Sequence, residues 1–510
     1  MSLNQIQLSP DQADAYDAVT ELLKSSGIDL HNELISHPQE VKNKVMALLG
    51  KAGSGKTLLL AKLYLALTQA KVQVIIGDYE PKKKQEKRTL AILAPTNKAA
   101  SVLRAQGVPA TTIHRILYTP VYDPEYDLLA EWLAGHGEKP TIEGLTEGAL
   151  TRAHEFYQNH KSMAGSLAAA GLKGSDFITG WKRREDPLDI VFLDEASMLD
   201  VKQFEDLQKI FSIVVMFGDP AQLAPVNQSG NMIFDCLKEI QVVRLKRVHR
   251  QSNDNPILNL AHALGDPLLN YEDFEDQIRD ISQTDERIQW TYRVEIDEMA
   301  RTPVLVWRNT TRIRLIHAFR NAYGAPETEL LPGEPLICDG IELPLKHRKK
   351  RLDLEARGLI KGAHAIYLGP GKRVGFSRLH VVGAEDPNLS AASIIKIEKP
   401  DFEEPFIPFA ASMGAAFLHG AAVTIHKAQG SQWEKVQVFA PDIFSAARMG
   451  RVEAGQQLWK RLAYVAITRA QSRLFWVVRN RLSKPSQSLT VNDLTKNTAS
   501  NQSLKSVSFD

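Results

Sequence analysis

The sequence predicts an α/β protein with two parallel-sheet domains and two inserted accessory domains, one mainly helical and one a small β domain. Three observations predict this class. Short apolar runs alternate with amphipathic segments in two separate stretches, which is the pattern of buried parallel strands covered by helices. The first stretch contains a glycine-rich loop between a strand and a helix. A length of 510 residues exceeds what one hydrophobic core organises, so several domains are expected.

The apolar runs define the two parallel-sheet domains. We assign residues 1–115 and 186–243 to the first domain, and residues 244–331 and 420–484 to the second. Each run is flanked by a longer segment with helical periodicity, as alternating strands and helices require. The runs are KVMALLG (44–50), LAILAPT (90–96), DIVFLDE (189–195) and VVMFGD (214–219) in the first domain, and VLVW (304–307), AAVTIHK (421–427), VQVFAP (436–441) and LFWVV (474–478) in the second.

Three other segments differ in composition. Residues 116–185 show helical periodicity and no strong strand, which predicts a mainly helical insertion. Residues 332–419 carry Pro and Gly between short β-type runs such as HAIYLG and ASIIKIE, which predicts a small β domain. Residues 485–510 are rich in Ser, Asn, Thr and Gln and are expected to be disordered.

The composition narrows the functional classes. No apolar run is long enough to span a bilayer, and the amino terminus lacks a secretory signal pattern, so we expect no membrane partner. The two cysteines, Cys236 and Cys338, form neither a disulfide framework nor a metal-ligand pattern. This usage fits a reducing compartment, and we expect a cytoplasmic protein.

The net charge of +2 means that any nucleic-acid binding must come from local patches. Two basic runs are candidates, one from Lys82 to Arg88 and one at 346–351 (KHRKKR). Each run is equally compatible with a solvated loop.

A phosphate-binding loop is indicated by GKAGSGKT at 50–57, which follows a predicted strand and precedes a predicted helix. Its glycines let backbone N–H groups face phosphate oxygens at the positive end of the helix dipole. Lys56 is expected to reach the β- and γ-phosphates, and the Thr57 hydroxyl to ligate Mg²⁺. ATP or GTP binding follows, through Gly50, Gly53, Ser54, Gly55, Lys56 and Thr57.

Two acids, Asp194 and Glu195, lie at the carboxyl end of the apolar run IVFL. Ligands of open parallel sheets sit at this edge, and two buried acids are costly unless a cation or water uses them. Asp194 is therefore the candidate Mg²⁺ partner, and Glu195 the candidate base that activates the attacking water.

Further segments follow in order from Gln12 to Arg469: LSPDQADAYDAV (8–19), LAPTNKAA (93–100), TIHRIL (112–117), FGDPAQLAPV (217–226), LKRVHRQ (245–251), VTIHKAQGSQW (423–433) and YVAITRAQ (464–471). With the phosphate loop and the acid pair, they resemble the motifs of superfamily 1 helicases, in the branch of the RecD-like and Dda-like 5′-to-3′ enzymes. The resemblance covers most of the chain. It implies two RecA-like motor domains and ATP-driven unwinding of DNA.

On the nucleotide side, the resemblance implies that Gln12 reads the adenine edge and that Gln222 senses the γ-phosphate, with Asp219 supporting its loop. Arg250 would contact the γ-phosphate and Arg469 would act as the arginine finger. Gly430 is assigned to the nucleotide site as well. Arginines on a second domain stabilise the charge of the transferred phosphoryl group only when the cleft closes, which links hydrolysis to movement.

On the nucleic-acid side, the resemblance implies that single-stranded DNA is contacted through Thr96, Asn97, Lys98, Thr112, His114, Thr424 and His426. Residues 116–185 would carry a strand-separating wedge that acts at junctions of single- and double-stranded DNA. Residues 332–419 would form an SH3-like insertion over the DNA, and residues 346–351 or the tail would be partner surfaces. One departure is Gln432, where RecD-like enzymes usually carry Glu. Members of this branch commonly act as monomers.

Four other functional classes share some of these features. A nucleotide kinase or a loading switch explains the phosphate loop and the acid pair but leaves the later motifs unexplained. An RNA helicase of the same superfamily shares the chemistry. The chain could also be the helicase subunit of a nuclease–helicase complex, because it carries no evident nuclease acid cluster of its own. A binding scaffold with an inactive ATP site is disfavoured by the intact Lys56, Glu195 and Arg469.

Overall fold

The structure is a computed structural model of the 510-residue chain. It describes residues 8–32, 34–36, 44–76, 88–122, 124–141, 146–161, 166, 178–225, 232–246, 255–342, 354, 357–382, 384, 387–397, 414–453 and 455–489.

The first parallel sheet confirms the predicted class for the amino-terminal half. Its strand order is β11-β3-β10-β9-β5-β4, with β6 paired to β5, and all of its pairs are parallel. Its central strands are apolar along their whole length because helices cover both faces. The strands are β3 (Lys44–Gly50), β4 (Gln73–Ile75), β5 (Thr89–Ala94), β6 (Thr111–Thr112), β9 (Leu188–Leu193), β10 (Phe211–Gly218) and β11 (Val242–Leu245), and the helices are α1 (Pro10–Lys24), α2 (Lys56–Gln69), α3 (Asn97–Ala105), α4 (Ile113–Leu117) and α8 (Val201–Ile210).

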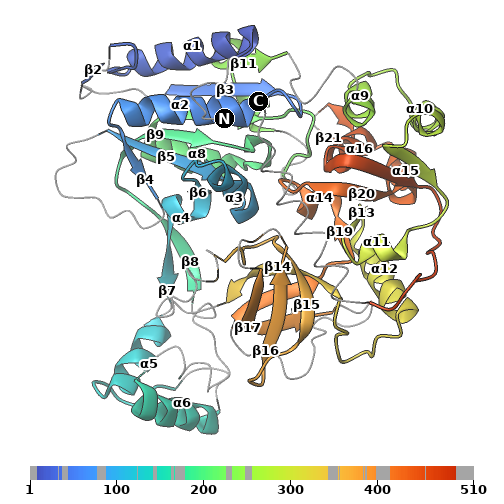
Figure 1. The fold of residues 1–510 in the computed structure, drawn as a ribbon. Helices are drawn as coiled ribbons and strands as arrows, with labels where there is room; N and C mark the ends of the chain where they lie inside the picture. Colours follow the sequence, from blue (N-terminus) through green and yellow to red (C-terminus); the bar gives the residue numbers. More distant parts are fainter. Residues whose placement is uncertain are drawn as a thin grey trace, which may run out of the picture.

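The second parallel sheet has the order β12-β23-β20-β13-β19, again with parallel pairs only. We call the two units the first and second sheet domains; they lie beside each other (Figure 1). The strands are β12 (Ile288–Thr291), β13 (Val304–Val306), β19 (Ala422–Thr424), β20 (Trp433–Phe439) and β23 (Ala470–Val477), and the helices are α9 (Pro256–Ala263), α10 (Tyr271–Thr284), α11 (Ile296–Met299), α12 (Asn309–Ala322), α14 (Ile425–Ala428), α15 (Ala440–Met449) and α16 (Leu458–Ile467).

A closed five-stranded barrel is inserted between α12 and β19. Its interior has an apolar cluster of its own, which includes Leu336, Leu379 and Phe417. The barrel agrees with the predicted small β domain. It lies below the junction of the two sheet domains in Figure 1. Its strands are β14 (Pro335–Glu342), β15 (His364–Pro370), β16 (Phe376–Val381), β17 (Asn388–Lys396) and β18 (Gly414–His419).

A buried polar cluster joins the barrel to the second sheet domain. The Glu334 carboxylate accepts from the Arg320 guanidinium of α12 at 3.0 Å and from His419 Nε2 at 2.9 Å. The backbone N–H of Ala421 donates to His419 Nδ1, so the ring proton lies on Nε2 and the imidazole is neutral. Burial lowers the pKa of His419, which keeps it in this form. The cluster fixes the start of the first barrel strand and the end of the last barrel strand against α12.

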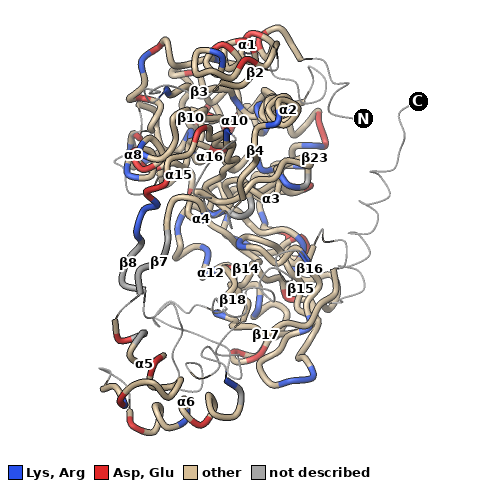
Figure 2. Tube along the Cα trace, turned by 90° about the vertical axis from the view of Figure 1, so that its left-hand side faces the viewer, with Lys and Arg blue, Asp and Glu red and all other residues tan. Residues whose placement is uncertain are grey.

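The other insertion differs from the prediction. Residues 118–183 begin and end as an antiparallel ribbon of β7 (Tyr118–Tyr122) and β8 (Ile178–Arg183), with helices α5 (Pro124–Ala134) and α6 (Glu147–His160) beyond it. The helices agree with the helical periodicity, but the prediction that this segment has no strong strand is wrong. Figures 1 and 2 show the ribbon leading away from the first sheet domain to the two helices.

The root of the ribbon is held by one carboxylate. Asp206 on α8 accepts from the Tyr118 hydroxyl at 2.7 Å and from Arg183 at 3.0 Å. These partners belong to β7 and β8, respectively. A side chain of the first sheet domain therefore grips both strands where they leave it.

Several sequence predictions lie outside the described residues. They concern Arg250, residues 346–351, Lys82 to Lys87, and the tail from residue 490 onward. Within the described ranges, no helix has the length and apolarity needed to cross a membrane. The domain boundaries assigned from the sequence remain predictions.

The turn after β13 depends on the fully buried Asp442. Its carboxylate accepts from the backbone N–H groups of Trp307 and Arg308 at 3.0 and 2.9 Å and from the Thr311 hydroxyl at 2.9 Å. The Arg308 guanidinium donates at 2.9 and 2.7 Å. Asp442 on α15 thus accepts hydrogen bonds from the backbone and side-chain donors at the start of α12.

We expect Asp442→Ala to destabilise the protein by about 3 kcal/mol, because buried donors and a cation lose their acceptor. Urea unfolding followed by circular dichroism measures the loss. The exposed Asp276 of α10 is the control, and Asp276→Ala should change stability by less than about 0.5 kcal/mol. Equal midpoints for the two variants would contradict the assigned role of Asp442.

Candidate nucleotide site and nucleic-acid pocket

The phosphate loop bends around its own lysine. Strand β3 ends at Gly50 and helix α2 begins at Lys56, with Gly53 at φ +85° and Gly55 at φ +77° in the left-handed region. Lys56 Nζ donates to the carbonyl oxygens of Gly50 at 2.5 Å and Lys51 at 3.2 Å. A loop closed in this way at a helix N-terminus presents backbone N–H groups to an anion.

Gln12 supports this loop from α1. Its side chain is 2% exposed; Nε2 donates to the Ser54 carbonyl at 3.0 Å, while Oε1 accepts from Ser9 N at 3.1 Å. The structure therefore uses the Gln12 amide to tie α1 to the phosphate loop. Its contact with an adenine edge remains a prediction.

The two acids follow β9, next to the phosphate loop. Asp194 is buried, and burial together with the neighbouring Glu195 charge raises its pKa to about 7, against the opposing effects of the Glu195 N–H and Lys56. Glu195 itself has φ +51°, a left-handed conformation that costs a non-glycine residue about 1–3 kcal/mol. The Lys56 charge compensates the buried Asp194 carboxylate only in part, which fits the predicted divalent cation at Asp194 and Thr57.

Glu195 is oriented by the loop that follows β10. Gln222 Nε2 donates to Glu195 Oε2 at 3.1 Å, and the Ser197 hydroxyl donates to Gln222 Oε1 at 3.3 Å. Both ends of the Gln222 amide are hydrogen-bonded, and the side chain is buried, with 5% exposed. The arrangement fixes one carboxylate oxygen of Glu195 and leaves the other to act on a water molecule.

The predicted arginine finger is bound within its own domain. The buried Arg469 guanidinium donates to the carbonyls of Val465 at 3.0 Å and Ser431 at 3.1 Å and to the Thr468 hydroxyl at 3.0 Å. Its role toward a γ-phosphate remains a prediction, as does that of Arg250.

Two residues that the sequence analysis missed cross between the sheet domains. The Tyr464 hydroxyl contacts the backbone N–H of Ala52 at 2.8 Å and the Asp219 carboxylate at 2.7 Å. Arg461 Nη1 donates to the carbonyls of Pro220 at 3.1 Å and Gln222 at 2.5 Å. The available signal was that Tyr464 is the first residue of the segment YVAITRAQ (464–471) and that Arg461 precedes it by three residues, on the same face of one helix.

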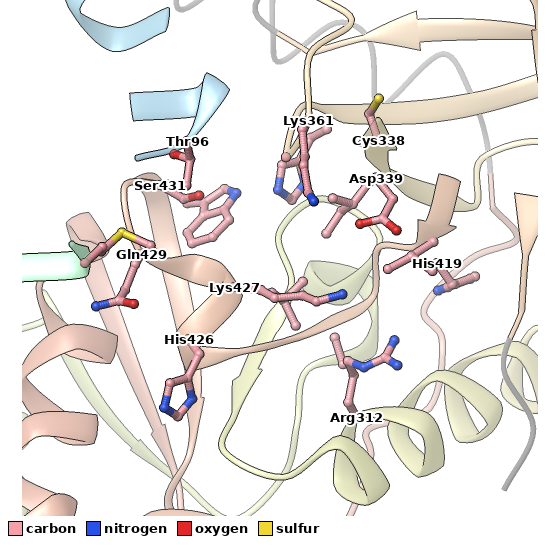
Figure 3. A pocket seen from close by; sticks show the side chains of 18 residues that line it. Thr96, Arg312, Cys338, Asp339, Lys361, His419, His426, Lys427, Gln429 and Ser431 are labelled. Atoms are coloured by element: carbon pink, nitrogen blue, oxygen red, sulfur yellow. The ribbon is translucent and has the colours of Figure 1, made fainter. Parts of the chain in front are cut away.

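A pocket of about 480 Å³ opens where the two sheet domains and the barrel meet (Figure 3). Of the predicted nucleic-acid contacts, it includes Thr96 and His426. Figure 3 shows Lys427 and Asp339 approaching its centre from opposite walls. The lining consists of Thr96 and Met198 from the first sheet domain, Arg312, Ala422, Val423, His426, Lys427, Gln429, Ser431 and Trp433 from the second, and Ile337, Cys338, Asp339, Lys361, Gly362, His364, Leu418 and His419 from the barrel insertion.

The chemistry of the pocket suits a nucleic-acid strand. Arg312, Lys361 and Lys427 supply positive charge against the single acid Asp339. The half-buried Trp433 indole packs edge-on against His364 of the barrel, with ring centroids 5.3 Å apart. An aromatic surface among cations is the arrangement used for single strands. Sequence reasoning missed these cations because they come from segments far apart in the chain.

The remaining predicted nucleic-acid residues have other positions. Thr112 is buried, and exposed His114 packs against Tyr118 with ring centroids 4.8 Å apart. Thr424 caps α14 by accepting from Lys427 N at 3.4 Å. In the pocket itself, burial lowers the pKa of His426, with Arg451 adding to the effect, so the imidazole is neutral near pH 7.

The segment after β5 begins a helix. Thr96 caps α3 by accepting from Ala99 N at 3.1 Å. Asn97 and Lys98 form the first turn of α3, and their side chains lie outside the described part. Gly430, at φ +71°, faces Thr96 and Ala99 across the domain junction, and its part in nucleotide binding remains a prediction. Among the described residues, no group of three or more His, Cys, Asp or Glu side chains has the geometry of a metal centre.

Two family models and a relative match this chain. A family model described as an AAA domain matches residues 32–280, and one described as a UvrD-like helicase C-terminal domain matches residues 419–477. The RecBCD enzyme subunit RecD of Mycolicibacterium smegmatis is 22% identical over 488 residues, which cover 90% of this chain and 72% of that protein. The family models and this relative confirm the predicted resemblance to RecD-like superfamily 1 helicases.

Two solved structures are also similar. The Pif1 helicase from Bacteroides in complex with ADP-AlF3 and ssDNA has a TM-score of 0.46 and 14% identity, over 97% of this chain and 98% of that one. The Pif1 helicase from Candida albicans has a TM-score of 0.43 and 15% identity, over 98% of this chain and 100% of that one.

We expect Glu195→Gln to lower kcat for ATP hydrolysis by about hundredfold or more while nucleotide binding persists, because an amide cannot accept the proton of the attacking water. Phosphate release and binding of a fluorescent ATP analogue measure the two quantities. Glu205→Gln, an exposed change on α8, is the control and should leave both unaltered. Near-normal turnover of Glu195→Gln would show that another group is the base.

Proposed function

We propose that this chain, which resembles the RecD-like helicases of superfamily 1, uses ATP to move 5′ to 3′ along single-stranded DNA and to unwind duplex DNA. Its enzyme class is that of a nucleic-acid-dependent ATPase. One observation carries the proposal. The cationic pocket is built jointly by both sheet domains and the barrel, so a strand held there contacts all three and responds when the sheet domains move relative to each other.

In the proposed reaction, Lys56 and the phosphate-loop N–H groups hold the ATP phosphates. Glu195, oriented by Gln222, takes a proton from the attacking water. Thr57 and Asp194 would hold Mg²⁺, which neutralises charge on the phosphates when bound. Arg250 and Arg469 are proposed to stabilise the transferred phosphoryl group from the second sheet domain.

The hydrolytic site and the pocket share a structural connection. Gln429 lines the pocket and donates through Nε2 to the Leu223 carbonyl at 3.3 Å, next to Gln222 in the loop that orients the base. Ser431 also lines the pocket and accepts from Arg469. Opening or closing of the cleft therefore changes the strand contacts and the hydrolytic geometry together, which is the requirement for a motor.

Lys427→Ala should weaken binding to single-stranded DNA about tenfold and reduce the salt slope of the affinity by about one, because one phosphate contact is lost. Fluorescence anisotropy with a labelled oligothymidine at several salt concentrations measures both. Lys202→Ala on the exposed face of α8 is the control, with wild-type values expected. An unchanged affinity of Lys427→Ala would remove the pocket from the nucleic-acid path. The same titration with oligouridine separates DNA from RNA as the preferred strand.

The direction of movement is tested with partial duplexes that carry one single-stranded tail. We expect ATP-dependent unwinding with a 5′ tail and at most a trace with a 3′ tail, because a 5′-to-3′ motor must load on the strand that leads into the junction. Release of a labelled strand gives the rate, and Glu195→Gln gives the baseline. Faster unwinding of the 3′-tailed duplex would reverse the proposed polarity while leaving the helicase activity in place.

A further inference from the structure

Tyr464 reaches out of the second sheet domain into the nucleotide site of the first. It lies on α16 and is 2% exposed. Its hydroxyl accepts from the backbone N–H of Ala52, in the phosphate loop, at 2.8 Å and donates to Asp219 Oδ2 at 2.7 Å. One hydroxyl thus bridges the loop that holds phosphates and the loop that follows β10. Burial and the Asp219 charge raise the pKa of Tyr464 well above its ordinary value, so it stays a neutral donor.

Asp219 passes this contact on to the hydrolytic pair. It is fully buried, its Oδ1 accepts from Ala221 N at 3.0 Å, and its carbonyl accepts from Gln222 N at 3.2 Å. The turn that Asp219 organises is therefore the turn that carries Gln222. The Gln222 side chain, in turn, holds Glu195 at 3.1 Å. A continuous path of hydrogen bonds runs from Tyr464 to the candidate base.

Arg461 reinforces the same turn from the same helix. It precedes Tyr464 by three residues, so both side chains project from one face of α16. Its guanidinium grips the carbonyls of Pro220 and Gln222 at 3.1 and 2.5 Å. The second sheet domain therefore holds the backbone on both sides of the turn. The Gln222 side chain contacts only residues of the first sheet domain among the bonds described above.

We propose that Tyr464 is a positioning residue for ATP hydrolysis: its hydroxyl links Ala52 to Asp219 when the cleft is closed and so sets the geometry of Gln222 and Glu195. The proposal rests on the assigned role of Glu195 and is independent of which nucleic acid the protein follows or in which direction. It explains how the second sheet domain controls a base that lies entirely in the first.

Tyr464→Phe removes the hydroxyl and keeps the ring. We expect kcat for ATP hydrolysis, measured both with and without single-stranded DNA, to fall on the order of tenfold, the loss expected for a hydrogen bond to a charged group. KM for ATP should stay within about twofold of the wild-type value, because the hydroxyl acts on the geometry of hydrolysis and not on ATP affinity.

Tyr271→Phe is a matched control in the same domain. Tyr271 is also buried, and its hydroxyl also donates to a carboxylate, that of Glu275, at 2.7 Å. It lies on α10, outside the contacts with the phosphate loop, and Tyr271→Phe should keep the wild-type kcat. Equal losses of kcat in the two variants would assign Tyr464 a general packing role and overturn the proposal.

A double-mutant cycle separates positioning from stability. Asp219→Asn alters the other end of the bond, and the double variant should be no slower than the slower single variant if both act through one path. Additive losses, or a wild-type kcat in Tyr464→Phe, would overturn the proposal. If Tyr464→Phe does not fold, Asp219→Asn alone tests the bond: a kcat loss on the order of tenfold supports it and a wild-type kcat overturns it. If added nucleic acid did not change the ATPase rate of the wild-type protein, the proposed motor would be refuted. The comparison of kcat between the wild-type protein and these variants would still test the role of Tyr464.

Discussion

The parallel pairing of β10 between β3 and β9 is the constraint on which the site depends. Gly218 lies opposite Leu49 of β3, and Met216 lies opposite Leu193 of β9, so the three strands end at nearly the same level. The phosphate loop, the acid pair and the turn at Asp219 follow these strand ends directly. Their side chains meet because carboxyl ends of parallel strands share one edge of the sheet. A shift of one register position would separate the lysine, the acids and the glutamine.

The second sheet domain and the barrel give this site its context. Helix α16 contacts the phosphate loop and the turn at Asp219, while α14 and the residues after it line the cationic pocket. The barrel forms the opposite wall and is tied to α12 through buried Glu334. The second sheet domain therefore faces the candidate nucleotide site through α16 and the pocket through α14. Cleft motion in such an assembly changes both surfaces together.

Much of this arrangement could be predicted from the sequence because buried strands carry continuous apolar runs. The eight predicted runs each overlap a strand of the two sheets, and the phosphate loop and acid pair follow strands directly. The ribbon was missed because β7 pairs with a segment about sixty residues away, and β7 contains Pro120 within a short polar and aromatic run. Tyr464 was missed because its partner Ala52 is 412 residues distant, a separation that local periodicity does not report. The pocket cations were missed for the same reason, because segments far apart in the chain bring them together.

The proposed motor requires that strand binding and the nucleotide state are coupled through one closing cleft. The affinity of Glu195→Gln for a labelled oligothymidine, measured with and without saturating ATP, tests it most directly, because the bound state is not consumed by hydrolysis. We predict that ATP changes the dissociation constant by about 5- to 150-fold, the usual range for coupled sites. The same dissociation constant with and without ATP would contradict it.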